Sequence, residues 1–257
     1  MVYLSKIVFP VFFLLSALVL SGQSNNTIGT ISVSDNVADG YTLFAPGSSN
    51  ITYLIDNCGN QINSWESDRT PGLSAYLLPN GNLVRTRRES QSFGFYAGGV
   101  GGGIEIFDWD GNKIWDFTLA NPQNILHHDI APMPNGNILA IAYELVTKEE
   151  VLALGRDLDK TPEGGLWIDK IIEIKPLDNN DLEIVWEWSS IDHIIQDSNA
   201  SLPNFGSASG NPGKLDFNYV PLQNSGSDWM HSNAIDYNPE LDQVCLLYTS
   251  PSPRDRG

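Results

Sequence analysis

The chain has 257 residues, with 14 Lys and Arg against 31 Asp and Glu, so its formal net charge is −17. Such an acidic chain lacks the clustered positive charge that binding to nucleic-acid phosphates requires. Its two cysteines are too few for a disulfide scaffold or a four-cysteine zinc site. Seven Trp, 23 Gly and 15 Pro residues favour a turn-rich β protein over a helical one.

Residues 1–22 are predicted to form a secretory signal peptide. Lys6 supplies the positive charge that precedes an apolar run at residues 7–20, and small residues follow up to Gly22. The run is shorter than the roughly 20 apolar residues that a membrane span needs, so cleavage is favoured over a membrane anchor. We therefore expect an exported protein, periplasmic or extracellular, in which residues 23–50 lead into the fold.

An internal repeat of hairpins follows. The strings YLIDNCGNQINSW, from Tyr53, and EIFDWDGNKIW, from Glu105, each indicate two short strands joined by an Asp/Asn/Gly turn and ending on Trp. A third copy occupies residues 171–188. We expect these Trp residues to pack between repeats and not to contact a ligand.

A second repeated element lies between the hairpins. LPNGNLV at residues 78–84 recurs as MPNGNIL at residues 133–139, and YNPELD at residues 237–242 takes the same place in the next copy. Four strands per unit of about 50 residues are typical of a β-propeller blade. A β-sandwich, the alternative all-β architecture, does not repeat one turn chemistry at a fixed period. Only residues 147–154 show a helical pattern.

We therefore predict an all-β fold in which residues 51–244 form part of a β-propeller of four-stranded blades. The parts are the outer half of one blade, two full blades and the start of another, at residues 51–66, 73–118, 127–188 and 231–244. A closed propeller needs at least four blades, so about half of the ring is expected to be missing.

Two segments depart from the repeat. Residues 189–228 form a long polar connection, and such connections are usually functional or mobile. Residues 245–255 read CLLYTSPSPRD, which is the translation of a transposase-type sequencing adapter. We interpret residues 245–257 as adapter read-through and the chain as an N-terminal fragment of a longer protein.

Histidine is the best candidate for chemistry. His128 lies seven residues before the turn residue Asn135, and His231 lies seven residues before Asn238, so the repeat places both at one position. The matching residue of the earlier copy is Leu73, which shows that the repeat itself does not need His. Two imidazoles at the start of neighbouring inner strands are expected to converge on one site beside the central channel.

Metal binding and serine nucleophilic chemistry are disfavoured. The chain has no H-x-x-x-H pattern or similar dense ligand set, and no G-x-S-x-G motif. The glycine run GGVGGG at residues 98–103 lacks the spacing of a nucleotide-binding loop. Acid–base or nucleophilic catalysis by His is the better class, with no metal and no cofactor.

The strings GYTLFAPGSSNITYLID, YLLPNGNLVRT, HHDIAPMPNGNILAIAYE and DWMHSNAIDYNPELD resemble bacterial aryl-sulfate sulfotransferases, over residues 40–244. The resemblance implies a six-bladed propeller that moves a sulfuryl group from a phenolic sulfate ester to a phenol, without a nucleotide sulfate. It implies a sulfo-histidine intermediate and small-molecule partners only.

Carried over by position, the resemblance implies that His128 and His231 are supporting catalytic histidines, with His127 as a neighbour. Asp129, Trp229 and Asn233 flank them and are predicted to contact the substrate. The family's Arg and its sulfated His are expected beyond residue 244, so the fragment itself is expected to be inactive. The alternative function is a secreted, non-catalytic propeller that binds a glycan or a protein.

Overall fold

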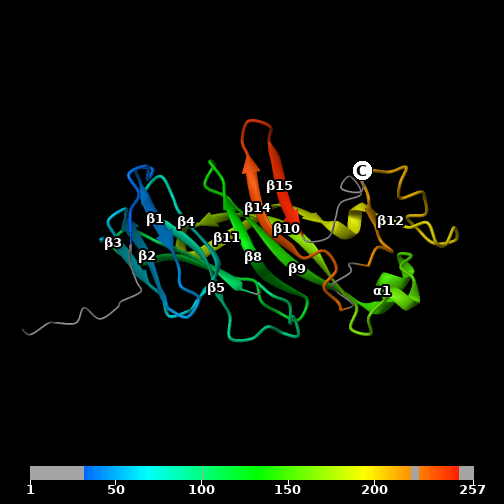
Figure 1. The fold of residues 1–257 in the computed structure, drawn as a ribbon. Coiled ribbons are helices and arrows are strands. Elements are labelled where there is room, and N and C mark those ends of the chain that lie inside the picture. Colours follow the sequence, from blue (N-terminus) through cyan, green and yellow to red (C-terminus); the bar gives the residue numbers. More distant parts are fainter. Residues whose placement is uncertain (1–31, 100, 221–225, 249–257) are drawn as a thin grey trace, which may run out of the picture.

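The computed structural model describes residues 32–99, 101–220 and 226–248, and its regular structure consists mainly of strands (Figure 1). The predicted signal peptide therefore lies outside the described residues. So do residues 249–257 of the segment interpreted as adapter read-through. Within the described ranges, no helix has the length and apolarity needed to cross a membrane.

Four antiparallel sheets follow one another along the chain, and within each sheet the strands pair in chain order. The first sheet contains β1 (Tyr41–Phe44), β2 (Ile51–Asp56) and β3 (Gln61–Glu66). The second contains β4 (Pro71–Leu77), β5 (Leu83–Arg88), β6 (Gly102–Phe107) and β7 (Lys113–Thr118). The third contains β8 (Asn124–Pro132), β9 (Ile138–Val146), β10 (Leu166–Leu177) and β11 (Asp181–Ser189). The fourth contains β14 (Ser232–Asn238) and β15 (Gln243–Tyr248).

The predicted all-β fold with two complete four-stranded units is confirmed, with unit boundaries a few residues from those expected. Two details differ from the prediction. β1 lies inside the segment expected as a lead-in and pairs with β2. β15 continues past residue 244 into the segment interpreted as adapter read-through. The closure of a ring and its number of blades stay predictions.

The hairpin turns have the repeated chemistry that the sequence predicts. Asp56 accepts hydrogen bonds from the backbone N–H and the side-chain amide of Asn60. Asp108 accepts the same two bonds from Asn112, and these bonds lower the pKa of each Asp. Each carboxylate thereby satisfies polar groups of its own turn, as Asx-type turns do.

The sheets pack face to face through apolar layers. Leu54 and Trp65 of the first sheet meet Leu83 and Phe107 of the second. Further layers join the second sheet to the third and the third to the fourth. Trp65 is 1% exposed, and Trp115 is likewise buried in the layer between the second and third sheets. Trp65 and Trp115 therefore pack between repeats, as predicted, whereas Trp186 of the third copy is 43% exposed.

The one predicted helix is confirmed as α1 (Lys148–Ala153), which begins with a capping box between Thr147 and Glu150. Three short 3-10 helices accompany it, η1 (Leu158–Lys160), η2 (Asp178–Asn180) and η3 (Ser190–His193). The long connection after β11 contains a parallel pair, β12 (Ile194–Ile195) and β13 (Leu215–Asp216). It is anchored by Ile194 and Phe217, which are buried against α1 and β10.

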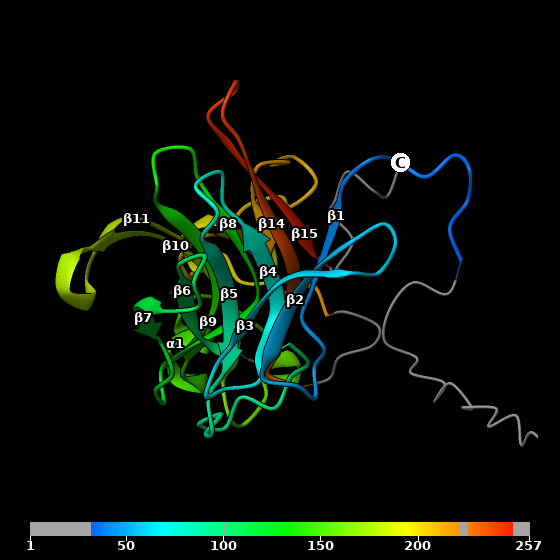
Figure 2. The ribbon, with the colours of Figure 1, turned by 90° about the vertical axis from the view of Figure 1, so that its left-hand side faces the viewer.

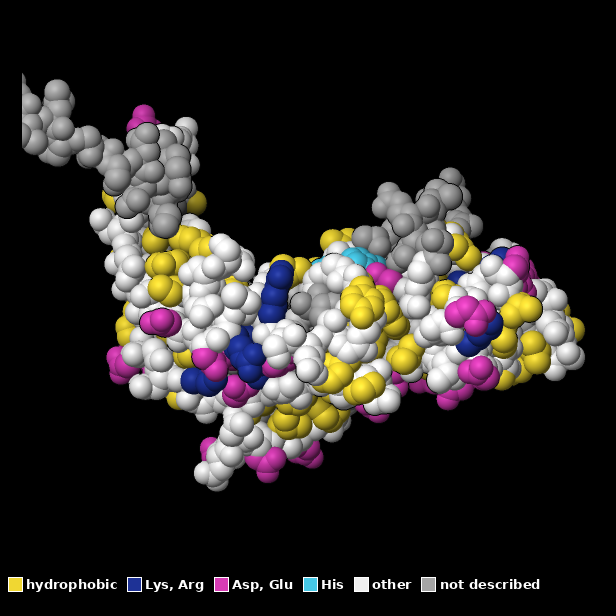
Figure 3. All heavy atoms as spheres, turned by 90° about the horizontal axis from the view of Figure 1, so that it is seen from below, with side chains coloured by type: hydrophobic (Ala, Val, Ile, Leu, Met, Phe, Trp, Pro, Cys, Tyr) yellow, Lys and Arg dark blue, Asp and Glu magenta, His cyan; other side chains and the backbone are white. Residues whose placement is uncertain are grey.

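The inner strands β4, β8 and β14 lie next to one another, with β8 in the middle, as the end-on view shows (Figure 2). Each belongs to a different sheet, so residues far apart in the sequence meet along this line. Acidic side chains are spread around the face seen in Figure 3, and histidine reaches the surface there in one small area. This row of inner strands positions the candidate site.

Candidate active site

The candidate site is built on irregularities of the inner strands. The pairing of β8 with β9 shifts between Leu126 and Ile130, so the segment with His127 and His128 leaves the regular ladder. β14 shifts just after its first residue, Ser232. Such bulges change the direction in which the side chains of the bulged residues point, and they are frequent beside active sites.

His128 and His231 share an unusual backbone conformation. Their φ angles are 51° and 58°, in the left-handed region that L-residues seldom occupy. Such a conformation costs about 1–3 kcal/mol and persists only where the surroundings impose it. The two residues therefore share a backbone conformation as well as a position in the repeat.

The two imidazoles meet, as the sequence predicts. The ring centroids of His128 and His231 are 4.8 Å apart, and the rings lie edge to face at 75°. His127 lies beside them, with its Nδ1 3.0 Å from Nδ1 of His128. Three of the four histidines thus form one cluster, while His193 stacks on Trp188 elsewhere.

A carboxylate and a phenol surround His231. Nδ1 of His231 lies 2.5 Å from Oδ2 of Asp228, and the hydroxyl of Tyr143 lies 3.0 Å from the same nitrogen. The hydrogen bond with Asp228 is the main cause that raises the pKa of His231. The carboxylate therefore favours the imidazolium form of this ring.

His128 has the opposite tendency. Burial, followed by the neighbouring rings of His127 and His231, lowers its pKa to about 4. His128 is therefore neutral near pH 7, while the adjacent His231 is held toward its charged form. Environments that push two neighbouring pKa values apart are the usual sign of separate acid and base roles.

His127 forms the buried floor of the cluster. Its ring stacks on that of Tyr143, with 3.6 Å between centroids and 2° between planes. Its Nε2 lies 3.3 Å from Oδ1 of Asp169 on β10, a residue that is completely buried. Oδ2 of Asp169 accepts hydrogen bonds from the backbone N–H and the hydroxyl of Ser232, at 2.9 and 2.5 Å. One carboxylate thereby connects β8, β10 and β14.

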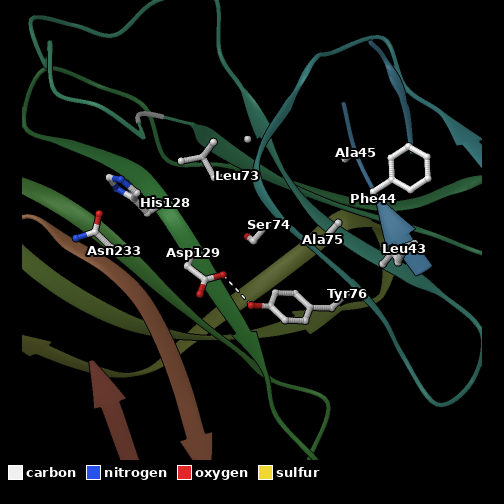
Figure 4. A pocket seen from close by; sticks show the side chains of 11 residues that line it. Leu43, Phe44, Ala45, Leu73, Ser74, Ala75, Tyr76, His128, Asp129 and Asn233 are labelled. Atoms are coloured by element: carbon white, nitrogen blue, oxygen red, sulfur yellow. Dashed lines mark hydrogen bonds between the residues drawn. The ribbon is translucent and has the colours of Figure 1, made fainter. Parts of the chain in front are cut away.

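A cavity of about 400 Å³ opens beside the cluster (Figure 4). Residues of β1, β4, β8 and β14 line it: Leu43, Phe44, Ala45, Gly72, Leu73, Ser74, Ala75, Tyr76, His128, Asp129 and Asn233. The close-up shows apolar side chains on the β1 side and His128, Asp129 and Asn233 on the other. The volume lies within the range typical of small-molecule sites.

Polar contacts fix two of the predicted substrate-binding residues. Asp129 accepts a 2.8 Å hydrogen bond from the hydroxyl of Tyr76 and one from the backbone N–H of Ile235. Burial and this bond with Asp129 raise the pKa of Tyr76. The side-chain amide of Asn233 donates to the carbonyl of His231. Asp129 and Asn233 both line the cavity, and their substrate contacts stay predictions.

Trp229 is placed differently. Its side chain is buried in the apolar cluster beneath α1, and its indole N–H donates to the carbonyl of Tyr219. It stacks edge to face on Phe217, and the guanidinium of Arg156 lies over both rings. Trp229 is not among the cavity-lining residues, so the structure gives this side chain a packing role.

The glycine run covers the cluster. The carbonyl of Gly99 accepts a hydrogen bond from the backbone N–H of His128, at 2.8 Å. A Cβ on Gly99 would lie 2.1 Å from Cε1 of His128, and its φ of +77° also disfavours other residues. The sequence suggests no role for this run, whereas the structure brings its backbone directly against the imidazole.

A model of the family described as Arylsulfotransferase (ASST) matches residues 29–248. The chain belongs to this family. A comparison with curated proteins found no match. The arylsulfotransferase match extends over all four sheets and over both histidine motifs.

Sequence reasoning missed two residues of this candidate site. Tyr143 and Asp169 lie on β9 and β10, and each is a polar residue within a buried, apolar strand. That contrast was a usable signal, since buried polar side chains are kept only where they are bonded. No group of three or more His, Cys, Asp or Glu side chains in the described ranges is arranged to hold a metal ion.

Proposed function

We propose that this protein moves a sulfuryl group from a phenolic sulfate ester to a phenol acceptor through a sulfo-histidine, without a nucleotide sulfate. Family membership supports sulfotransferase chemistry at the family level. The observation that carries the finer proposal is the pair His128 and His231. The two rings share one site, with their pKa values displaced in opposite directions.

In the first half-reaction, a histidine nitrogen attacks sulfur while the S–O bond to the donor phenol breaks. The departing phenolate needs a proton, and the imidazolium of His231 can supply one. The same positive charge stabilises the sulfuryl oxygens as they approach. Asp228 sustains this role because its carboxylate favours the charged ring.

In the second half-reaction, the acceptor phenol attacks sulfur, the N–S bond breaks and a new S–O bond forms. The phenolic proton must leave during this step, and the neutral imidazole of His128 can accept it. A pKa near 4 keeps His128 unprotonated at neutral pH, which leaves a lone pair on the ring for this proton. The sulfated histidine itself is proposed to follow residue 244, as the family resemblance implies.

The cavity supports an aryl substrate. Its apolar wall contains Leu43, Phe44 and Leu73, and Leu73 occupies the position in its sheet that His128 occupies in the next. A phenyl ring can pack on that wall while its sulfate ester faces His128 and Asn233. Leu73 is 56% exposed, so its side chain is accessible to such a ring.

The proposal concerns the exported protein with its native continuation, which we expect to close a six-bladed propeller. The test incubates that full-length protein with a chromogenic aryl sulfate, with and without a phenol acceptor and with no nucleotide sulfate. We expect release of the chromogenic phenol only when the acceptor is present. Equal release without acceptor would identify a sulfatase instead, and binding without any turnover would identify a non-catalytic module.

A further inference from the structure

We propose that Asp169 and His127 are positioning residues that hold His128 in one tautomer, with the proton on Nδ1 and a free lone pair on Nε2. The inference rests on the proposed function, because it explains how His128 can serve as its proton acceptor. It is carried by two consecutive contacts, from the carboxylate of Asp169 through His127 to His128, and by the stacking of Tyr143 on His127.

The first contact is between Asp169 and His127. Oδ2 of Asp169 already accepts both donors of Ser232, which leaves Oδ1 facing Nε2 of His127 at 3.3 Å. Within the described residues, neither Oδ1 nor this Nε2 has a hydrogen-bond partner. Both side chains are completely buried. Two facing lone pairs would repel each other there, so Nε2 of His127 must carry a proton toward the carboxylate.

The second contact, between His127 and His128, determines which nitrogen of His128 carries the proton. The proposal takes His127 as neutral: with its single proton on Nε2, the ring presents a lone pair at Nδ1. That atom lies 3.0 Å from Nδ1 of His128, so the proton between the two nitrogens belongs to His128. A neutral imidazole carries only one N–H, and therefore Nε2 of His128 is unprotonated and able to accept a phenolic proton.

The third contact prevents His127 from turning. The ring of Tyr143 lies flat on it, with 3.6 Å between centroids, and Tyr143 is itself completely buried. A flip of the imidazole would break both nitrogen contacts. The orientation is thus set by packing, and the protonation pattern follows from it.

His128 is surrounded by further groups that influence it. His127 and His231 oppose its protonation, while the carboxylates Asp169 and Asp228 favour it less strongly. The backbone of Gly99 closes another side of the ring. Because His231 is bonded to Asp228 through its own Nδ1, it does not compete for Nδ1 of His128. His127 and His231 therefore have separate carboxylate partners, Asp169 and Asp228.

The direct test reads the tautomers of the full-length protein by 15N NMR with labelled histidine, each ring being assigned by its single substitution. We expect a pyridine-type Nε2 in His128 and a pyrrole-type Nε2 in His127 near pH 7. A protonated Nε2 in His128, or a doubly protonated His127, overturns the inference. This reading needs no turnover, so it stays separate from the test of the proposed function.

A substitution can reverse the pattern. In Asp169→Asn, the backbone N–H and the hydroxyl of Ser232 still need an acceptor, so the amide oxygen takes the place of Oδ2. The amide nitrogen must then face His127. His127 then accepts at Nε2 and donates from Nδ1, which moves the proton of His128 to Nε2. We expect kcat to fall by about 10²-fold or more, the range lost with a general base, with KM little changed.

Asp228→Asn is the matched control, because it makes the same chemical change at the carboxylate that serves His231. It should leave the tautomer of His128 unchanged in the NMR spectrum. If Asp169→Asn retained the wild-type tautomer of His128, the proposed positioning role of Asp169 and His127 would be refuted. If Asp169→Asn failed to fold, the wild-type tautomers would still decide.

Discussion

His128 and His231 lie edge to face, with 4.8 Å between their ring centroids, although they belong to different sheets. Both have a positive φ angle and both stand at an irregularity of an inner strand. Their surroundings nevertheless differ, because Asp228 is hydrogen-bonded to His231 while burial and two other rings act on His128. One repeat position has thus produced two chemically distinct histidines.

Replacing either histidine should abolish most of the proposed activity. For His128→Ala and His231→Ala in the full-length protein, we expect kcat to fall by about 10²–10⁴-fold, since each removes one proton-transfer group. His193→Ala is the matched control, because His193 stacks on Trp188 outside the cluster. Steady-state kinetics with a chromogenic aryl sulfate checks this, beside circular dichroism to show that the fold is retained. Full activity in both variants would contradict the assigned roles.

The pH dependence should reveal the bond between Asp228 and His231. Because this bond raises the pKa of His231, activity that needs the imidazolium is present below that pKa and is lost as the pH rises through it. In Asp228→Asn the pKa falls, so the alkaline loss of kcat/KM should move to lower pH. Asp192→Asn, at an exposed carboxylate on η3, should leave the profile unchanged. An unshifted profile in Asp228→Asn would refute the dependence.

Stability should have an acid limb that is due to His128. Its pKa is about 4 in the folded protein and about 6.5 in an unfolded chain. The unfolded state therefore binds a proton first, and stability is lost as the pH falls from about 6.5 toward 4. In His128→Gln this part of the acid destabilisation should disappear. Urea unfolding at several pH values measures the free energy of unfolding. If it fell equally with pH in the wild type and in His128→Gln, His128 would make no such contribution.

Within the glycine run, a side chain at Gly99 should disturb the histidine cluster. A Cβ on Gly99 would lie 2.1 Å from the His128 ring, so Gly99→Ala should displace that ring and lower kcat by at least tenfold. Gly94→Ala is the matched control, because Gly94 also has a positive φ, +95°, but nothing lies within 4 Å of its Cβ position. Equal kinetics of the two variants would show that only backbone strain matters.

Because Trp115 is buried between two sheets, its replacement by Ala should cause a large loss of stability. Its side chain is 4% exposed between the second and third sheets, and its indole N–H donates to the carbonyl of Asp181. Trp115→Ala should lower the free energy of unfolding by about 3–5 kcal/mol. Trp186→Ala, at a side chain that is 43% exposed, should cost much less. Urea denaturation compares the two, and similar losses would contradict the packing role.

Much of the fold was readable from the sequence because it depends on local chemistry that repeats. The Asp-x-x-Gly-Asn turns at Asp56 and Asp108 satisfy their own polar groups, so they form wherever that spacing recurs. The strand β1 was not predicted, because it has a single copy of four residues and gains its pairing only from β2. Short, unrepeated strands carry too little pattern to be recognised.

The acidic composition and the histidine spacing were properties of the sequence alone. They excluded nucleic-acid binding and placed His128 and His231 at one repeat position, because a period in the chain becomes a period in space. Tertiary structure decided what surrounds them. Tyr143 and Asp169 reach the cluster only because β9 and β10 continue the sheet that begins with β8, and because β14 packs against that sheet. Trp229 turns into the core. Protonation depends on these neighbours, and distance along the chain does not determine which groups become neighbours.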